Sequence, residues 1–148
     1  MDKNSIRLLA QDLIGRQLFG VKFEYKNRHG KITVQTLDSV VHIQGDQYKV
    51  IGAKDTIDIE NCKPYLFSCI LLEEEIEFYG QKICILDELA KKDIVIVQHK
   101  GTWLRASEYE IIDFSRYFDV LDTFHVDYRG LIQKDLAIQI EKDNNPYK

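Results

Sequence analysis

Residues 21–35, VKFEYKNRHGKITVQ, are the stretch that decides the fold. Every second residue from 21 to 25 is apolar, and the same period of two returns at 32–34. Such alternation places the apolar side chains on one face of a β-strand. Residues 27–30 join the two runs and contain Asn and Gly, which favour a tight turn. The stretch therefore predicts an antiparallel β-hairpin.

Short apolar runs continue beyond this hairpin. They occupy residues 40–44, 47–51 and 56–59 and are separated by turns that contain glycine and aspartate. Four or five short antiparallel strands within residues 18–59 are typical of a meander or of a small, strongly bent barrel.

An amphipathic helix is predicted ahead of the first strand, over Asn4–Ile14. Asn4 or Ser5 could cap its start, and Gly15 stands where a left-handed residue often ends a helix. The apolar residues that recur at helical spacing are Ile6, Leu9, Ala10 and Leu13.

The middle of the chain is mixed in character. The segments predicted there are, in order, a buried strand over 65–72, a hairpin that turns at 79–81, a short helix over 87–92 and a β-branched strand over 94–97. After them comes the longest predicted helix, Glu108–Phe124, in which Ser107 and Glu110 form a capping box ahead of an apolar stripe.

Together these elements predict an α+β fold. It would contain an N-terminal helix, a β-rich small-barrel-like half, a mixed middle and a long C-terminal helix packed on the sheet. A chain of 148 residues fits one domain. The β-rich half would cover 1–62, the mixed half 63–140, and a polar, frayed tail 141–148.

Composition limits the class of protein. Hydrophobic residues make up 45% of the chain, and no apolar run approaches the roughly 20 residues that span a bilayer. Cys62, Cys69 and Cys84 are odd in number and lack CxxC spacing, so neither a disulfide framework nor a zinc site is predicted. Free thiols and the lack of a signal-peptide pattern favour the cytoplasm. Phosphate-loop and dinucleotide motifs are missing as well, so no cofactor or metal is predicted.

One short segment combines varied side-chain chemistry: His125, Asp127, Tyr128 and Arg129. In a catalytic interpretation His125 is a general base oriented by Asp127, and Arg129 binds an anion. In a structural interpretation His125 lies near the negative end of the helix dipole and Asp127 bonds turn amides. Arg129 then pairs with a carboxylate, and Gly130 supplies a positive φ. Adjacent residues seldom converge on one point, so the structural interpretation is favoured.

Two further features could bind a partner. The predicted hairpin turn carries Lys26, Arg28, His29 and Lys31, which could contact phosphate or form a solvated turn. Trp103 could anchor a recognition surface if exposed, or pack the following helix onto the sheet if buried.

The segment HVDYRGLIQKDLA, residues 125–137, resembles a string in small uncharacterised proteins of Bacteroidetes and of their phages and prophages. In that group the string has the form HFDYRGLIxKGLA, so this chain departs at Val126 and Asp135. KPYL at 63–66 resembles a second string of the group, although Phe67-Ser68 follows here in place of Arg-Pro. The resemblance implies a phage or mobile-element origin and a location in the bacterial cytoplasm. It implies no catalytic residues.

The sequence therefore predicts a non-catalytic accessory protein that binds a host or phage protein. A net charge of -4 lacks the basic excess of a general nucleic-acid binder, so nucleic acid is the second candidate partner, through the hairpin around Lys26–Lys31. A small hydrolase that uses the His125–Arg129 cluster is the third candidate.

Overall fold

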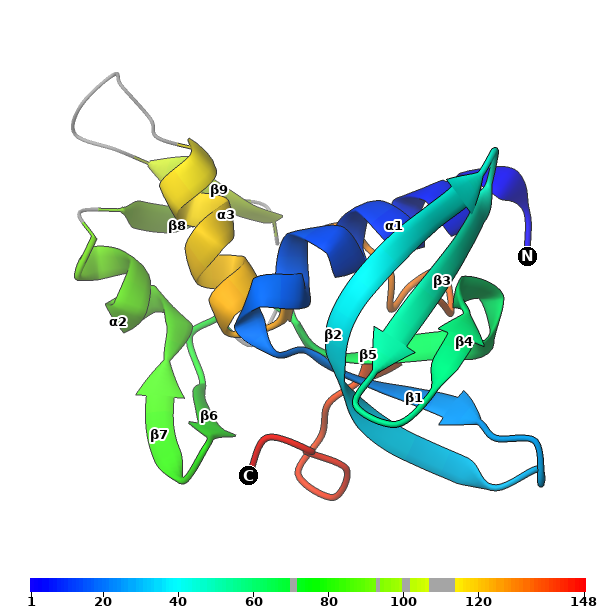
Figure 1. Cartoon of the computed structure of the whole chain (residues 1–148). Helices are drawn as coiled ribbons and strands as arrows, with labels where there is room; N and C mark the ends of the chain where they lie inside the picture. The colour runs from blue at the N-terminus through cyan, green and yellow to red at the C-terminus, as the bar shows by residue number, and fades with distance from the viewer. Residues whose placement is uncertain (70–71, 93, 100–101, 107–113) are drawn as a thin grey trace.

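A computed structural model describes all residues of the chain except 70–71, 93, 100–101 and 107–113. Figure 1 shows the elements in chain order. They are α1 (Lys3–Arg16), a 3-10 turn (Gln17–Phe19), β1 (Lys22–Lys26), β2 (Ile32–Gln44), β3 (Gln47–Gly52), β4 (Thr56–Asp58), a second 3-10 turn (Ile59–Asn61), β5 (Cys62–Ser68), β6 (Glu75–Phe78), β7 (Gln81–Cys84), α2 (Ile85–Ala90), β8 (Val95–His99), β9 (Thr102–Ala106), α3 (Phe114–Thr123), β10 (Val126–Asp127) and β11 (Ile138–Gln139).

The main sheet has seven strands and mixed direction. Its order is β10-β5-β1-β2-β3-β4, and β11 also pairs with β5. β10 and β11 run parallel to β5, whereas the other neighbours are antiparallel. Among the described residues β4 pairs only with β3, so the hydrogen-bonded ladder stays open and does not close into a barrel. β2 is long and curved (Figure 1). Its first part pairs with β1 and its second part pairs with β3.

The hairpin predicted from residues 21–35 is confirmed as β1 and β2, which pair from Lys22↔Thr36 to Lys26↔Ile32. β2 is longer than expected because the runs predicted at 32–34 and 40–44 form one strand. A bulge between Leu37 and Ser39 shifts its register. Since a bulge adds one residue to one strand, it changes which alternate side chains face inward.

Helix α1 begins one residue earlier than predicted. Asp2, not Asn4 or Ser5, is the cap, because its carboxylate accepts the backbone N–H groups of Asn4 at 2.9 Å and Ser5 at 3.1 Å. Gly15 lies within the helix, and the left-handed residue is Gly20, with φ 67°, after the 3-10 turn.

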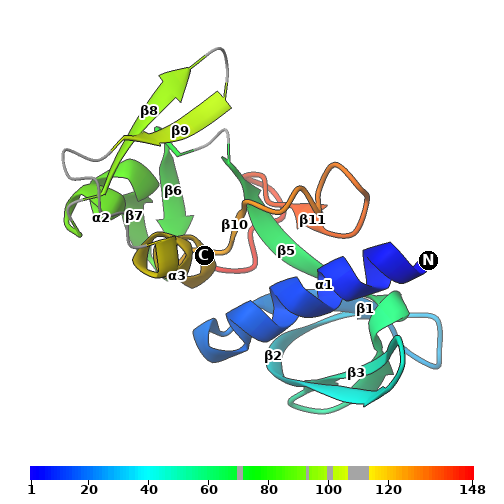
Figure 2. The same cartoon turned by 90° about the horizontal axis from the view of Figure 1, so that it is seen from above.

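Two hydrophobic cores share β5. Figure 2 shows β5 between α1 with β1–β3 on one side and α2, α3 and the β6–β7 hairpin on the other. The first core lies between α1 and the bent strands β1–β3 and includes Cys62 and Leu66 from β5. The second gathers α2, α3 and the β6–β7 hairpin and includes Tyr65 and Phe67. Because alternate side chains of a strand point to opposite faces, β5 contributes to both cores.

The predicted α+β class with a long C-terminal helix packed on the sheet is wrong. The structure is mostly β, and its helices are short. α3 covers ten residues, Phe114–Thr123, and its apolar side contacts the second core. The capping box of Ser107 and Glu110 lies outside the described residues. No helix in the described ranges is long and apolar enough to cross a membrane.

The tail predicted to fray is held in place by several contacts, and its most buried side chain is that of Tyr147. Tyr147 is fully buried, its hydroxyl donates to the Tyr65 carbonyl at 3.1 Å, and it accepts the Lys22 N–H at 2.7 Å. The expectation of a frayed end over 141–148 came from polar composition, which does not reveal a single aromatic anchor.

Candidate functional site

The Asp127 carboxylate organises the turn that follows α3. Its Oδ1 accepts the backbone N–H groups of Arg129 at 3.3 Å and Leu131 at 3.0 Å, and its Oδ2 accepts that of Ile132 at 2.8 Å. Gly130 has φ 73°, which is unfavourable for residues with a side chain. Asp127 is buried and engaged by three amides, as the structural interpretation expected.

His125 is fully buried and adopts a left-handed φ of 56°. Its ring stacks on Tyr147 at 4.6 Å between ring centres and lies 5.7 Å from Phe78. Neither ring nitrogen has a hydrogen-bond partner among the described residues. Burial, together with the positive charge of Arg16, lowers the pKa of His125 to about 3. A general base needs access to its substrate and a pKa near the working pH, so this geometry does not suit His125 for catalysis.

Arg16 forms the centre of a buried ionic cluster. Its guanidinium holds both Asp12 carboxylate oxygens, at 2.8 and 2.9 Å, and donates to the Val126 carbonyl at 2.7 Å and the Leu121 carbonyl at 3.4 Å. Asp122 lies 3.6 Å away. Burial alone would lower the pKa of Arg16, but the Asp12 carboxylate outweighs it and raises that pKa. The charged cluster joins α1 to the segment around α3 and β10.

Tyr128 and Arg129 complete this cluster. The Arg129 guanidinium donates to the Tyr128 hydroxyl at 3.0 Å, and its Nε lies 3.4 Å from the Asp12 carboxylate. The guanidinium carbons of Arg129 and Arg16 lie 4.9 and 5.4 Å from the centre of the Tyr128 ring. Burial and the nearby Asp122 carboxylate raise the pKa of Tyr128 to about 12. Two arginines face two aspartates, so the cluster offers no net charge to a ligand.

Arg129→Ala is expected to lower the free energy of unfolding by about 1–2 kcal/mol, because it removes a donor and a cation from a mostly buried cluster. The arginine side chain is 29% exposed, so solvent screening reduces the effect. Urea unfolding measures the change. Arg28→Ala, on the exposed hairpin turn, serves as the control. Equal stability of the two variants would show that Arg129 has no structural role.

The stability should also depend on the protonation of His125. With a pKa of about 3 when folded and 6.5 when unfolded, the unfolded chain binds more protons between these pH values. The contribution of His125 to the free energy of unfolding is therefore fully present above pH 6.5. Between pH 6.5 and about 3 it is lost by roughly 1 kcal/mol for each unit by which the pH falls. Urea unfolding at several pH values should show a flatter slope for His125→Phe. The exposed-site variant His29→Phe should retain the wild-type slope.

The turn of the β1–β2 hairpin exposes a group of basic side chains. Asn27 shapes the turn, since its side-chain oxygen accepts the backbone N–H groups of His29 and Lys31, each at 3.0 Å. Gly30 has φ 75°. All four predicted residues, Lys26, Arg28, His29 and Lys31, are exposed.

A cleft lies on the outer face of this hairpin, with a volume of about 510 Å³. One wall is the β1–β2 ribbon and the other is the tail, where Lys22 Nζ donates to the Pro146 carbonyl at 2.9 Å. The Tyr65 hydroxyl donates to Glu24 at 2.7 Å, and burial together with Glu24 raises the pKa of Tyr65 to about 12. The residues that line this hairpin cleft are Lys22, Val34, Gln35, Thr36, Tyr65, Asp143, Asn144 and Pro146.

A second cleft, of about 520 Å³, lies between the β6–β7 hairpin and the other side of the tail. Phe67, Ile76 and Ile140 lie at its buried base, and its rim carries charges of both signs, such as Glu77 and Lys82. A rim of mixed charge does not select one sign of ligand.

The remaining candidates carry less information. Trp103 lies on β9, but its side chain is outside the described part of the structure. Residues 73–75, an acidic run, are exposed. Among the described residues, no group of three or more His, Cys, Asp or Glu side chains could hold a metal ion.

The sequence did not single out Asp12, Arg16 or Tyr147. A signal was present for two of them, because Asp12 and Arg16 are spaced i, i+4 beside the apolar stripe of α1. That spacing brings the two side chains together on the helix, but it does not distinguish a buried ion pair from an exposed one. Tyr147 offered no such signal.

Comparison of the chain with protein-family models, with curated proteins and with solved structures gives no significant match. The function is therefore inferred from the residues of this chain.

Proposed function

We propose that this protein is a non-catalytic accessory protein of phage or mobile-element type, which binds another protein in a bacterial cell. The contact would be made by the hairpin surface, defined here as Lys26, Arg28, Lys31, Ile32 and Val34. One observation carries the proposal. Of the eight exposed large apolar side chains in the described residues, four lie on the single strand β2: Ile32, Val34, Val41 and Ile43.

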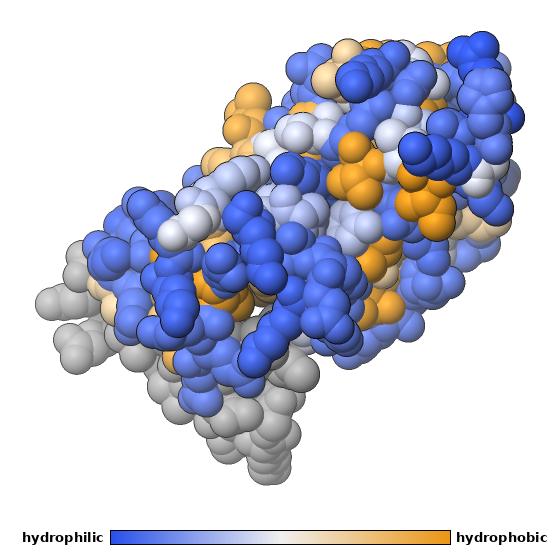
Figure 3. Space-filling model, turned by 90° about the horizontal axis from the view of Figure 1, so that it is seen from below, coloured by the Kyte–Doolittle hydropathy of each residue, from blue (hydrophilic) through white to orange (hydrophobic). Residues whose placement is uncertain are grey.

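Single exposed apolar residues are common and need no explanation. Several on one strand are more often found where the surface contacts a partner. Ile32 and Val34 are 59% and 43% exposed and stand beside the hairpin cleft. Figure 3 shows apolar residues in separate groups within a largely hydrophilic face. Small apolar groups rimmed by polar side chains suit a reversible protein contact better than a large permanent interface.

The enzyme alternative receives little support. The ring of His125 is enclosed by aromatic side chains, and Asp127 is engaged by turn amides. A hydrolase built on these residues would have to unfold its own turn to reach a substrate.

Ile32→Lys combined with Val34→Lys is expected to reduce binding of the native partner at least about tenfold, because two buried aliphatic contacts would become charged. Co-purification from the native host, read by quantitative mass spectrometry, identifies the protein whose recovery depends on these residues. Val41→Lys combined with Ile43→Lys makes the same change at the other end of β2 and serves as the control. A partner whose recovery does not depend on Ile32 and Val34, or no partner at all, would overturn the proposal.

Nucleic acid is the second candidate, favoured by the exposed cations of the hairpin turn. Binding of this kind weakens steeply with salt as counterions are released. Fluorescence anisotropy with labelled single-stranded DNA, single-stranded RNA and duplex DNA at two salt concentrations tests it. Lys26→Ala, Arg28→Ala and Lys31→Ala together should then abolish binding.

A further inference from the structure

We infer that the partner segment bound by the hairpin surface is an acidic, extended stretch of protein that places one apolar side chain in the hairpin cleft. This inference rests on the proposed function and specifies the chemistry of the partner. It combines the charge of the turn, the apolar side chains beside it and the shape of the cleft.

The hairpin turn carries a charge opposite in sign to that of the rest of the chain. Residues 26–31 carry +3 with His29 neutral, while the whole chain carries -4, so the rest of the chain carries -7. A concentrated positive patch attracts acidic segments of a partner and repels basic ones. The three cations lie within six residues of one tight turn, so their fields add at this end of the hairpin.

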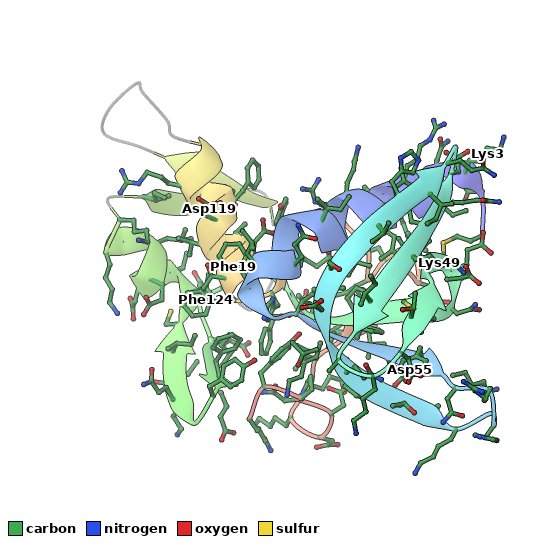
Figure 4. The ribbon with its side chains drawn as sticks, viewed as in Figure 1. Lys3, Phe19, Lys49, Asp55, Asp119 and Phe124 are labelled. Carbon is green, nitrogen blue, oxygen red and sulfur yellow. The ribbon has the colours of Figure 1, made fainter. Side chains whose placement is uncertain are left out.

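The cations of the turn face solvent. Two other lysines of the same sheet are paired: Lys49, labelled in Figure 4, lies 2.7 Å from Asp58, and Lys63 lies 2.6 Å from Asp135. Among the described residues, no ion pair is formed by Lys26, Arg28 or Lys31. Their charges are therefore free to attract a partner.

The apolar side chains stand on the same ribbon as the cations. Ile32 pairs with Lys26, and Val34 pairs with Glu24 two residues further along each strand. Val34 then forms part of the cleft wall, together with Tyr65 and Pro146. A segment lying along the ribbon would meet cations at the turn and, one step later, a cleft of mixed lining in which Val34, Tyr65 and Pro146 offer apolar surface. About 510 Å³ is ample for one aliphatic or aromatic side chain.

A protein segment suits this surface better than a nucleic acid. Single-stranded nucleic acids bind through aromatic side chains on which bases stack. The only large aromatic side chain strongly exposed among the described residues is Tyr79, which lies in the β6–β7 turn and not on this hairpin. A phosphate backbone would also leave Ile32 and Val34 without contacts.

A display library of random 12-residue peptides, selected on the full chain, tests the inference. Enriched peptides are expected to contain several Asp or Glu residues and one large apolar residue. A synthetic enriched peptide should lose at least about tenfold in affinity when its acids are replaced by amides, and its affinity should fall as salt rises from low to high concentration.

Variants of the protein locate the contact. Lys26→Glu, Arg28→Glu and Lys31→Glu together should weaken peptide binding at least about tenfold. Lys3→Glu, Lys82→Glu and Lys134→Glu make the same change in charge at exposed sites elsewhere and should change it less than about twofold. Thr36→Tyr, which fills the cleft without removing a cation, should also weaken binding.

Three results would overturn the inference: no acidic enrichment among selected peptides, unchanged affinity after charge reversal, or binding of labelled nucleic acid at physiological salt that the same reversal abolishes. The two proposals can fail separately. If the Ile32→Lys, Val34→Lys variant loses a native partner that the charge-reversed variant keeps, the proposed function stands and only the acidic segment is refuted. If neither variant loses a partner, both fail.

Discussion

Arg16→Met is expected to lower the free energy of unfolding by about 3–5 kcal/mol, the range observed when one member of a buried ion pair is removed. The guanidinium is fully buried and holds both oxygens of Asp12. Its loss leaves that carboxylate in a nonpolar setting with only Arg129, at 3.4 Å, nearby. The Leu121 and Val126 carbonyls lose the guanidinium as a donor as well, although the Val126 carbonyl still accepts the Tyr128 N–H at 3.1 Å.

Urea unfolding followed by circular dichroism measures this effect. Arg7→Met is the matched control, because Arg7 pairs with Asp46 at 2.6 Å while its side chain is 60% exposed. An exposed pair of this kind contributes less than about 1 kcal/mol. Adding Asp12→Leu to Arg16→Met should recover part of the loss, since no unpaired carboxylate then remains at that position. A loss for Arg16→Met as small as that of the control would contradict the structural role of the cluster.

Tyr147→Ala is expected to have an effect of similar size, about 3–5 kcal/mol, because it empties a fully buried aromatic site. The ring stacks on His125 and lies 5.5 Å from Phe78, so its removal opens a cavity within the second core. Tyr147→Phe keeps the ring but removes the hydroxyl that joins Lys22 and Tyr65, and should cost about 1–3 kcal/mol.

The control for this pair is Tyr79→Ala, which removes a tyrosine that is 56% exposed. Its expected effect on the free energy of unfolding is below about 1 kcal/mol. Thermal melting of the three variants ranks them. If Tyr147→Ala had the same melting temperature as the wild type, the tail would be frayed as its composition suggested. The cleft wall formed by Pro146 would then not be stable.

Local patterns predicted the elements whose cause is local. Alternation of apolar residues gave the hairpin at 21–35, and the turn chemistry of Asp127 and Gly130 was correct because both act on their own neighbours. The apolar stripe near Phe118 indicated a helix. It contained no information on what that stripe would contact, so the expected packing of a long helix on the sheet was wrong.

In the candidate site, too, the sequence predicted local features but not those formed by distant residues. The basic turn from Lys26 to Lys31 was visible in the sequence because it is contiguous. The cleft beside it was not, because Val34, Tyr65 and Pro146 come together from three distant parts of the chain. Likewise, the partners of Arg16 at Leu121 and Val126 lie more than a hundred residues away, beyond the reach of any periodicity.

The position of β5 between the two cores makes their stabilities interdependent. Its backbone pairs with β1 on one edge and with β10 and β11 on the other, and the Phe67 amide is bonded to the His125 carbonyl at 2.8 Å. Neither core can open without disrupting a strand that the other requires. The Phe67 amide hydrogen should therefore exchange with deuterium only when the whole chain unfolds, and the two cores should melt in a single cooperative transition.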